Sequence, residues 1–293
     1  MGTSCGVPTK YRGLPSVALR KNGELLLFDC GEGTQRQMMT YGLSFMKINR
    51  IFITHLHGDH YLGLFGLVQS MSFFGRTDPL EVFGPRSMES VCETVTTIGD
   101  FSPGFEVLGS DLSPGQTVDC EGYSVTAEGV RHSVPTLAYV VEEHERPGKF
   151  DVEKARSIGI PEGLLYKRLQ EGEVVEWQGR SVEPSELMGP PRPGRKVVYI
   201  GDAEPTDEIV AIAKSANLLI SEGTFCDDLA DRAQETGHST VRQICAIAER
   251  ASVGRLLLTH FSPRYDAEDI RREVSFQPTL IGRDGMTLEV QYS

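Results

Sequence analysis

The stretch Thr54-His-Leu-His-Gly-Asp-His60 carries three histidines and one aspartate within six positions. It continues the apolar run 50–54, which predicts a strand, so the polar residues begin where that strand ends. The pattern H-x-H-x-D-H arises by chance in roughly 2 of 10,000 chains of this composition, so a solvated polar turn is the weaker interpretation. Imidazole and carboxylate are ligands of Zn²⁺ and, with less preference, of Mn²⁺ and Fe²⁺. The stretch therefore predicts a metal centre.

Three further candidate ligands, His132, Asp202 and His260, each lie at the carboxyl end of a predicted strand. Taken alone, each is equally well interpreted as a hydrogen-bonded turn residue. Strand carboxyl ends in an α/β protein converge on one crevice, however, so we expect these side chains to meet the 55–60 loop. The seven candidate ligands are more than the four that close a structural zinc site. A catalytic site, by contrast, leaves a coordination position for water.

Length, charge and cysteine spacing indicate which classes of protein this chain can belong to. The 293 residues suit one large α/β domain or two ordinary ones, and a net charge of -12 predicts weak nonspecific attraction to polyanions. The longest stretch without charge or histidine, Tyr61–Gly75, is shorter than the ~18 residues of a membrane span. No secretion signal is evident, and the six widely spaced cysteines fit reduced thiols. We expect a cytoplasmic protein with no membrane partner.

Periodicity predicts alternating strands and helices with one interruption. The helices are expected over Tyr61–Phe74, Met88–Ile98, Thr206–Ser215, Ser239–Ala251 and Ala267–Val274. In the helix expected over Ser239–Ala251, Thr240 and Gln243 are spaced as an N-terminal capping box. Between Glu142 and Arg195 the charge is dense and glycine and proline recur, which indicates an inserted arm.

Seven stretches together resemble a known family. They are Gly2-Thr-Ser-Cys-Gly-Val-Pro-Thr9, Leu27-Phe-Asp-Cys-Gly-Glu-Gly-Thr-Gln-Arg-Gln37, Thr54–His60 with Gly63-Leu-Phe-Gly-Leu67, His132-Ser-Val-Pro-Thr136, Tyr199-Ile-Gly-Asp202, Gly237-His-Ser-Thr240 and Thr259-His-Phe-Ser-Pro-Arg-Tyr265. The chain resembles the metallo-β-lactamase fold and, within it, the short form of tRNase Z, the tRNA 3′-processing endonuclease. The loop after Asp29 and the stretch 260–265 make the match more specific than the histidine motif alone.

The resemblance implies an α/β fold, a metallo-β-lactamase αββα four-layer sandwich over 1–293 with a flexible exosite arm inserted at 142–195. It implies two Zn²⁺ per subunit, with Mn²⁺ or Fe²⁺ as substitutes. One metal would be bound by His55, His57 and His132 and the other by Asp59, His60 and His260, with Asp202 between them. Asp59 and His238 would be catalytic residues, and His238 would protonate the leaving oxygen.

The resemblance further implies that the substrate is precursor tRNA and that the protein is a homodimer, in which the arm of one subunit often serves the site of the other. The acid Glu222 would orient His238, although Ser221 and Gly223 depart from the usual His-Glu-Ala-Thr run of the family. Predicted RNA contacts are Arg264, Arg192, Arg195 and Lys196. For Arg264 a surface salt bridge is an equally good interpretation. Gly163-Leu164 stands where the family has a Gly-Pro pair.

Three functions remain in competition at this point. The first is a zinc-dependent endoribonuclease that removes the 3′ trailer, leaving a 3′-hydroxyl on the tRNA and a 5′-phosphate on the trailer. The second is a hydrolase of the same fold acting on a small phosphodiester, sulfate ester or lactone. The third is a zinc-dependent RNA-binding module without catalysis, which the complete ligand set disfavours.

Overall fold

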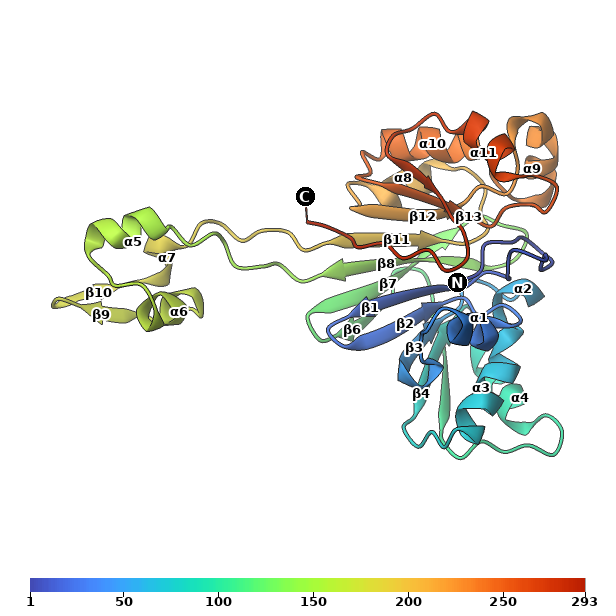
Figure 1. Ribbon diagram of the computed structural model, residues 1–293, viewed down its shortest axis with the longest axis horizontal. Helices are drawn as coiled ribbons and strands as arrows, with labels where there is room; N and C mark the ends of the chain where they lie inside the picture. The colour runs from blue at the N-terminus through green and yellow to red at the C-terminus, as the bar shows by residue number, and fades with distance from the viewer. Residues whose placement is uncertain (293) are drawn as a thin grey trace. The chain divides into compact units, whose positions relative to one another are not determined.

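The computed structural model describes residues 1–292, which form two compact units. The first unit joins Met1–Glu142 to the chain that follows Gly194, and the second is Glu143–Gly194 (Figure 1). Among the described residues no helix is both long and apolar enough to cross a membrane.

The first unit is built on two sheets. The five-stranded sheet has the order β1-β2-β3-β4-β5, with bounds Val17–Lys21, Glu24–Phe28, Ile48–Phe52, Leu80–Gly84 and Val107–Asp111. The seven-stranded sheet has the order β14-β13-β12-β11-β8-β7-β6. From β6 to β14 these strands are Thr117–Cys120, Tyr123–Val130, Thr136–Glu143, Lys196–Ile200, Leu218–Glu222, Leu256–Thr259 and Thr279–Ile281. The strands β11 to β14 run parallel, so their carboxyl ends share one edge.

Side chains of alternate residues leave a strand on opposite faces, and β2 shows how this makes layers. Leu25 and Leu27 pack in the cluster that includes helix residues such as Met38 and Leu67, while Leu26 and Phe28 pack against the other sheet. The helices on the first sheet are α1 Thr34–Thr40, α3 Gly63–Phe73 and α4 Met88–Thr97. Those on the second sheet are α8 Asp207–Ala213, α10 Val241–Arg250 and α11 Ala267–Glu273. The expected αββα arrangement is confirmed (Figure 1).

The helix expected over Tyr61–Phe74 is confirmed as α3, Gly63–Phe73, and the end of the histidine motif forms a short helix of its own that was not predicted. The short α2, Gly58–Tyr61, is followed by α3 from Gly63. The N–H of Gly63 donates to the carbonyl of Cys30 at 2.9 Å, and a Cβ at this position would lie 2.0 Å from the carbonyl oxygen of Gly31. A glycine is therefore required where this turn of chain meets the 30–31 loop.

Several other elements differ from expectation. The capping box of Thr240 and Gln243 is confirmed, although α10 is shorter than predicted. The helices α1 and α9, Ala230–Thr236, and the strands β5, β6 and β14 were not predicted. The η1 and η2 turns, Phe45–Lys47 and Asp227–Leu229, are single 3₁₀ turns.

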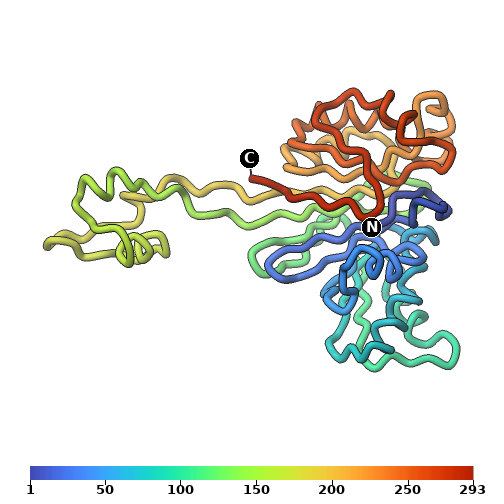
Figure 2. Tube along the Cα trace, viewed as in Figure 1, coloured from blue at the N-terminus to red at the C-terminus, as the bar shows by residue number. Residues whose placement is uncertain are grey.

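The second unit has a core of its own. It contains α5 Val152–Ile158, α6 Leu164–Gln170, β9 Val175–Trp177, β10 Arg180–Val182 and α7 Pro184–Leu187. Buried side chains such as Tyr166, Leu169 and Val182 form one cluster inside it. Its two ends run side by side, since Arg146 and Arg192 exchange backbone hydrogen bonds of 2.8 and 2.9 Å (Figure 2).

Candidate metal centre

The seven predicted ligands come from four places in the sequence and meet in the first unit. His55, His57, Asp59 and His60 lie in the loop and helix α2 after β3. His132 lies between β7 and β8, Asp202 follows β11, and His260 follows β13. All seven fall into side-chain groups compact enough to hold a metal ion.

The first donor group consists of His55, His57, His132 and Asp202. The His57 Nδ1 atom lies 3.1 Å from His55 Nε2 and 3.3 Å from His132 Nε2. The Asp202 Oδ2 atom lies 3.6 Å from His55 Nε2 and 3.9 Å from His132 Nε2. Three nitrogens and one oxygen therefore surround a single point, which is the donor set of a zinc site.

The second donor group consists of Asp59, His60 and His260, and it also borders Asp202. The Asp59 Oδ2 atom lies 3.6 Å from His60 Nε2 and 3.5 Å from His260 Nε2. The other oxygen of Asp202, Oδ1, lies 3.4 Å from His60 Nε2 and 3.1 Å from His260 Nε2. Asp202 thus presents one carboxylate oxygen to each group.

Three buried atoms at this point lack a hydrogen-bond partner among the described residues. They are His60 Nε2, His260 Nε2 and Asp202 Oδ1. A buried polar atom without a partner costs about 1–3 kcal/mol, so their convergence calls for a ligand between them. Imidazole nitrogen and carboxylate oxygen are donor types that fit a divalent transition metal.

Electrostatics explain how the cluster keeps donor atoms available. Burial and the neighbouring imidazole of His60 lower the pKa of His55 to about 2, which keeps its ring neutral. Burial opposes ionisation of Asp202, yet the facing imidazoles of His260 and His60 hold the pKa of this carboxyl well below its usual range. The carboxylate is therefore charged and the His55 ring is a free lone-pair donor.

A surrounding set of hydrogen bonds orients the rings. The Nδ1 atoms of His55, His60 and His260 contact Thr54 Oγ1 at 3.0 Å, Asp29 Oδ2 at 2.8 Å and Thr224 Oγ1 at 2.9 Å respectively. His132 Nδ1 lies 2.8 Å from the carbonyl oxygen of Gly237. Fixing one ring nitrogen turns the other toward the centre, which is the usual arrangement around a protein-bound metal.

Asp29 orients several groups around the metal centre, a role that the sequence of the glycine-rich loop beside it did not indicate. Its carboxylate accepts hydrogen bonds from the N–H of Thr54 at 2.7 Å and from the hydroxyl of Tyr199 at 2.7 Å, in addition to contacting His60. Asp29 and His260 both have positive φ angles, 55° and 57°. Such conformations are costly outside glycine and cluster at functional sites, here at the first position after β2 and β13.

His238 lies at the border of the cluster. Its Nδ1 atom contacts both oxygens of Glu222, at 3.1 and 3.2 Å, and lies 3.9 Å from Asp202 Oδ2. Glu222 is fully buried and also accepts the N–H groups of Ala203 and Ser239, at 2.7 and 3.2 Å. Burial alone would lower the pKa of His238, but the Glu222 carboxylate raises it above the ordinary value.

A contact from the N-terminal loop was missed at the sequence level. The N–H of Gly6 donates to Asp59 Oδ2 at 2.8 Å, and the N–H of Cys5 donates to the carbonyl of Phe261 at 3.0 Å. The loop is thereby tied to both sides of the second donor group. Thr54, Tyr199 and Thr224 were missed as well, because nothing in a single polar residue after an apolar run indicates its distant partner.

The four predicted RNA contacts are divided between the two units. The exposed Arg264 follows the metal-centre strand β13, and its Nε donates to Ser262 Oγ at 3.0 Å. Arg192 belongs to the second unit and donates to the carbonyl of Pro147 at 3.1 Å. Arg195 and Lys196 belong to the first unit and donate to the carbonyls of Val290 and Lys214, at 2.9 and 3.2 Å. Their contact with RNA stays a prediction.

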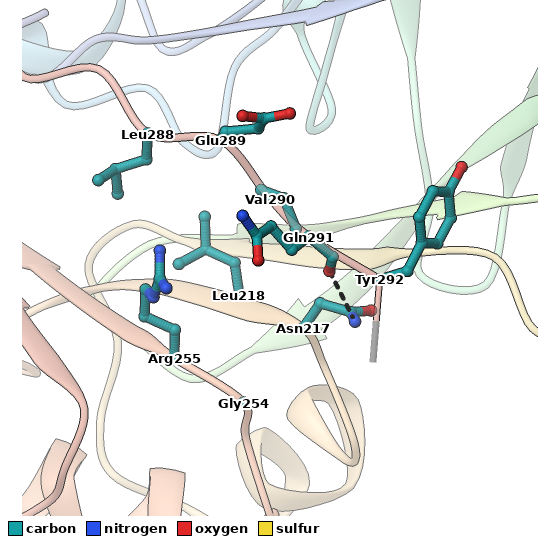
Figure 3. A pocket seen from close by; sticks show the side chains of 9 residues that line it. All are labelled: Asn217, Leu218, Gly254, Arg255, Leu288, Glu289, Val290, Gln291 and Tyr292. Carbon is teal, nitrogen blue, oxygen red and sulfur yellow. Dashed lines mark hydrogen bonds between the residues drawn. The ribbon is translucent and has the colours of Figure 1, made fainter.

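A separate cavity of about 260 Å³ lies beside the C-terminal segment. Residues 288–292 line it together with Asn217, Leu218, Gly254 and Arg255 (Figure 3). The Asn217 amide donates to the carbonyl of Gln291 at 3.3 Å. None of the candidate ligands lines this cavity. The six cysteines are free thiols, as their spacing predicted.

Comparison with known proteins agrees with this site. The beta-lactamase superfamily domain profile matches residues 174–261, and the profile of the anti-Pycsar protein Apyc1 matches residues 5–92. Ribonuclease Z of Methanosarcina acetivorans is 43% identical over 296 residues, covering 100% of this chain and 97% of the relative. Ribonuclease Z of Methanothermobacter thermautotrophicus is 44% identical over 294 residues, covering 99% and 95%.

Two solved structures extend the comparison. The crystal structure of human tRNase Z, short form (ELAC1), matches with a TM-score of 0.70 and 28% identity over 99% of this chain and 98% of the other. The metallo-beta-lactamase fold protein YhfI of Bacillus subtilis matches with a TM-score of 0.70 and 18% identity, over 97% and 95%. The latter likeness shows the fold alone.

Proposed function

The chain belongs to the ribonuclease Z family, and from this membership we propose how its residues perform the family's reaction. It is a tRNA 3′-processing endoribonuclease, a phosphodiester hydrolase that removes the 3′ trailer from precursor tRNA. The products are a tRNA with a free 3′-hydroxyl and a trailer with a 5′-phosphate.

The cofactor is a pair of Zn²⁺ ions in each subunit, for which Mn²⁺ or Fe²⁺ can substitute. His55, His57 and His132 would hold one ion, and Asp59, His60 and His260 would hold the other. The observation that carries this proposal is Asp202, whose two oxygens face the two donor groups separately. A bridging carboxylate of this kind is suited to a two-metal hydrolytic site.

A metal pair in such a site supplies a water molecule of lowered pKa and neutralises negative charge on the phosphate oxygens. The protein's own part begins with orientation. Asp29 and Thr224 hold the rings of His60 and His260, so the donor nitrogens are fixed before substrate arrives. Asp59 is held by the N–H of Gly6 and keeps its carboxylate toward the same point.

His238 supplies the proton that the departing ribose 3′-oxygen needs. Its Nδ1 is held by Glu222, so Nε2 is the atom available to the leaving group. The raised pKa keeps a larger fraction of the ring protonated near neutral pH than an ordinary histidine has. Glu222 is a positioning residue, because it acts on the substrate only through His238.

Replacing His238 with alanine is expected to lower kcat by about 10²–10⁴-fold while metal content stays at the wild-type level, since general-acid help has this size. Single-turnover cleavage of a precursor tRNA and metal analysis of the same preparation measure both quantities. Glu222→Gln is the companion variant and should shift the pH profile of kcat, because the neutral amide no longer favours the protonated ring. An unchanged kcat in His238→Ala would reject this assignment.

The unit Glu143–Gly194 is the tRNA-binding arm. It grips the tRNA away from the scissile bond. Several of its cations form local ion pairs, such as Arg156 with Glu162 and Arg168 with Glu173. Arg192 is closer to the arm's base, and Arg264 lies beside the metal centre as a phosphate contact. Arg195 and Lys196 add positive charge where the arm joins the first unit.

The functional protein is a homodimer. Large apolar side chains are exposed on α1 and α3, two helices in mutual contact, and Phe73 is 89% exposed and Met39 62% exposed. Leu62 and Phe74 lie at the two ends of α3 and are also exposed. Exposed apolar side chains on neighbouring helices are typical of an interface, and a second copy of the chain covers them.

Phe73→Glu is expected to convert the dimer into a monomer, because a carboxylate would be buried in an apolar interface. Light scattering coupled to gel filtration at micromolar concentration measures the mass. The control is Leu164→Glu, which changes a similarly exposed apolar residue of the second unit. A Phe73→Glu protein that keeps the mass of the wild type would contradict the proposed interface.

The compartment is the cytoplasm, where free thiols stay reduced. The test of the function as a whole is a purified, zinc-loaded protein with one precursor tRNA labelled at both ends. We expect a single cut whose ends map to a 3′-hydroxyl and a 5′-phosphate. Absence of trailer removal by a protein carrying both metals would reject the proposal.

A further inference from the structure

A cavity of about 370 Å³ opens beside His238 in the first unit. One wall comes from the loop after β11, with Glu204, Pro205 and Thr206. The other walls come from α9, with Asp231 and Gln234, and from α10, with Gln243. His238 completes the lining, so this residue borders both the cavity and the metal centre.

The lining carries polar side chains that other described residues do not engage, of which Glu204 is half-buried and Asp231 and Gln234 are exposed. The side chains of Glu204, Asp231 and Gln234 make no hydrogen bond or ion pair with other described residues. The backbone N–H of Glu204 donates to the carbonyl of Arg131 at 2.8 Å, which fixes the loop. Gln243 uses its Oε1 to accept the N–H of Thr240 at 2.8 Å, so its amide hydrogens remain for the cavity.

The chemistry of these groups narrows the kinds of occupant. Two carboxylates repel a phosphate group, so the RNA backbone does not enter. Neither Glu204 nor Asp231 belongs to a group of three described ligands close enough to hold a metal ion, so nothing in the lining of these two acids points to one. The remaining occupant is a group that donates hydrogen bonds, and nucleobase edges do so.

The reaction places one base next to this cavity. Cleavage breaks the bond between phosphorus and the ribose 3′-oxygen, and His238 gives its proton to that oxygen. The same ribose carries the base of the last nucleotide that the tRNA retains. Because single-stranded RNA ends are recognised through bases turned out of the stack, this base can enter the cavity beside His238.

We propose that the cavity lined by Glu204, Asp231 and Gln234 binds the base of the last retained nucleotide and selects bases that carry an exocyclic amino group. Carboxylates accept hydrogen bonds from the amino groups of adenine, cytosine and guanine, whereas uracil has no amino group. This inference rests on the proposed function and adds a specificity determinant to it.

The experiment uses the full-length, zinc-loaded protein and four precursor tRNAs that differ only in the last retained nucleotide. The wild type should cleave the A, C and G substrates about tenfold faster in kcat/KM than the U substrate. In the double variant Glu204→Gln with Asp231→Asn the difference should shrink to about twofold, because amides lack the carboxylate charge. The matched control Glu235→Gln changes an acid of the same helix that pairs with Arg232, and should keep the wild-type preference.

Each outcome decides the matter. Equal cleavage of all four substrates by the wild type, or an unchanged preference in the double variant, overturns the proposed base pocket and leaves the endonuclease function intact. Loss of the preference in Glu235→Gln as well also overturns it, since the effect would then not belong to the cavity. Failure of the wild type to cleave any of the four would reject the proposed function itself, and the pocket with it.

Discussion

Asp202→Ala is expected to lower cleavage of precursor tRNA by about a thousandfold or more, and to reduce the bound metal below two ions per chain. This residue is the one side chain shared by both donor groups, with Oδ2 near His55 and Oδ1 near His60 and His260. Metal pairs in hydrolases supply several kcal/mol of transition-state stabilisation, and each 1.36 kcal/mol is a factor of ten in rate. Elemental analysis and single-turnover kinetics on the same sample measure the two effects.

A control separates chemistry from folding in this experiment. Asp100→Ala removes an exposed carboxylate after α4 and should leave rate and metal content unchanged. Thermal unfolding of Asp202→Ala should remain cooperative, because the layers of the first unit are built on apolar clusters that do not include Asp202. An Asp202→Ala protein that keeps two metals and wild-type cleavage would contradict the shared-carboxylate site.

The ligands could be predicted because their signal is local. Three histidines and an aspartate within one short motif are rare by chance, and each remaining ligand lies one or two residues after the end of a strand. The parallel strands β11 to β13 then bring Asp202 and His260 to one edge of a sheet. The convergence of the seven ligands therefore follows from their positions at or near strand ends, which the sequence pattern predicts.

The partners of the ligands could not be predicted, because their signal is not local. Asp29 reaches His60 across 31 positions and Tyr199 reaches Asp29 across 170. Neither tyrosine nor threonine carries a spacing that indicates a distant imidazole. Glu222 was assigned to His238 only through a family resemblance, and the buried position that explains its role depends on packing between β12 and the 238–239 turn.

The second unit shows a different limit. Its sequence is dense in charge, and hydrophobic periodicity is weak over elements as short as the seven residues of α5 and α6. The cluster around Tyr166 and Leu169 nevertheless closes a core once those short elements fold against one another. Charge pattern alone predicted an insertion but not its internal order.

Removing the second unit is expected to abolish efficient cleavage of precursor tRNA while hydrolysis of bis(p-nitrophenyl) phosphate continues at a comparable rate. Residues 143–194 are replaced by Asn-Gly. Glu142 pairs with Lys196 across the antiparallel strands β8 and β11, so the three-residue loop formed with Arg195 joins them without strain. The small ester needs only the metal centre, whereas the tRNA loses a second point of attachment.

The size of the loss follows from that second attachment. Binding at two linked points exceeds either alone by about 10²–10⁴-fold, so kcat/KM for tRNA should fall by at least about a hundredfold. Metal analysis and thermal unfolding of the shortened protein verify that the first unit is intact, and the ratio of the two activities gives the result. If tRNA and the small ester lost activity in equal measure, the unit would serve the metal centre's integrity and not the grip on tRNA. If neither lost activity, the metal centre alone would select its substrate, and a hydrolase of small phosphodiesters would be the better description of the protein.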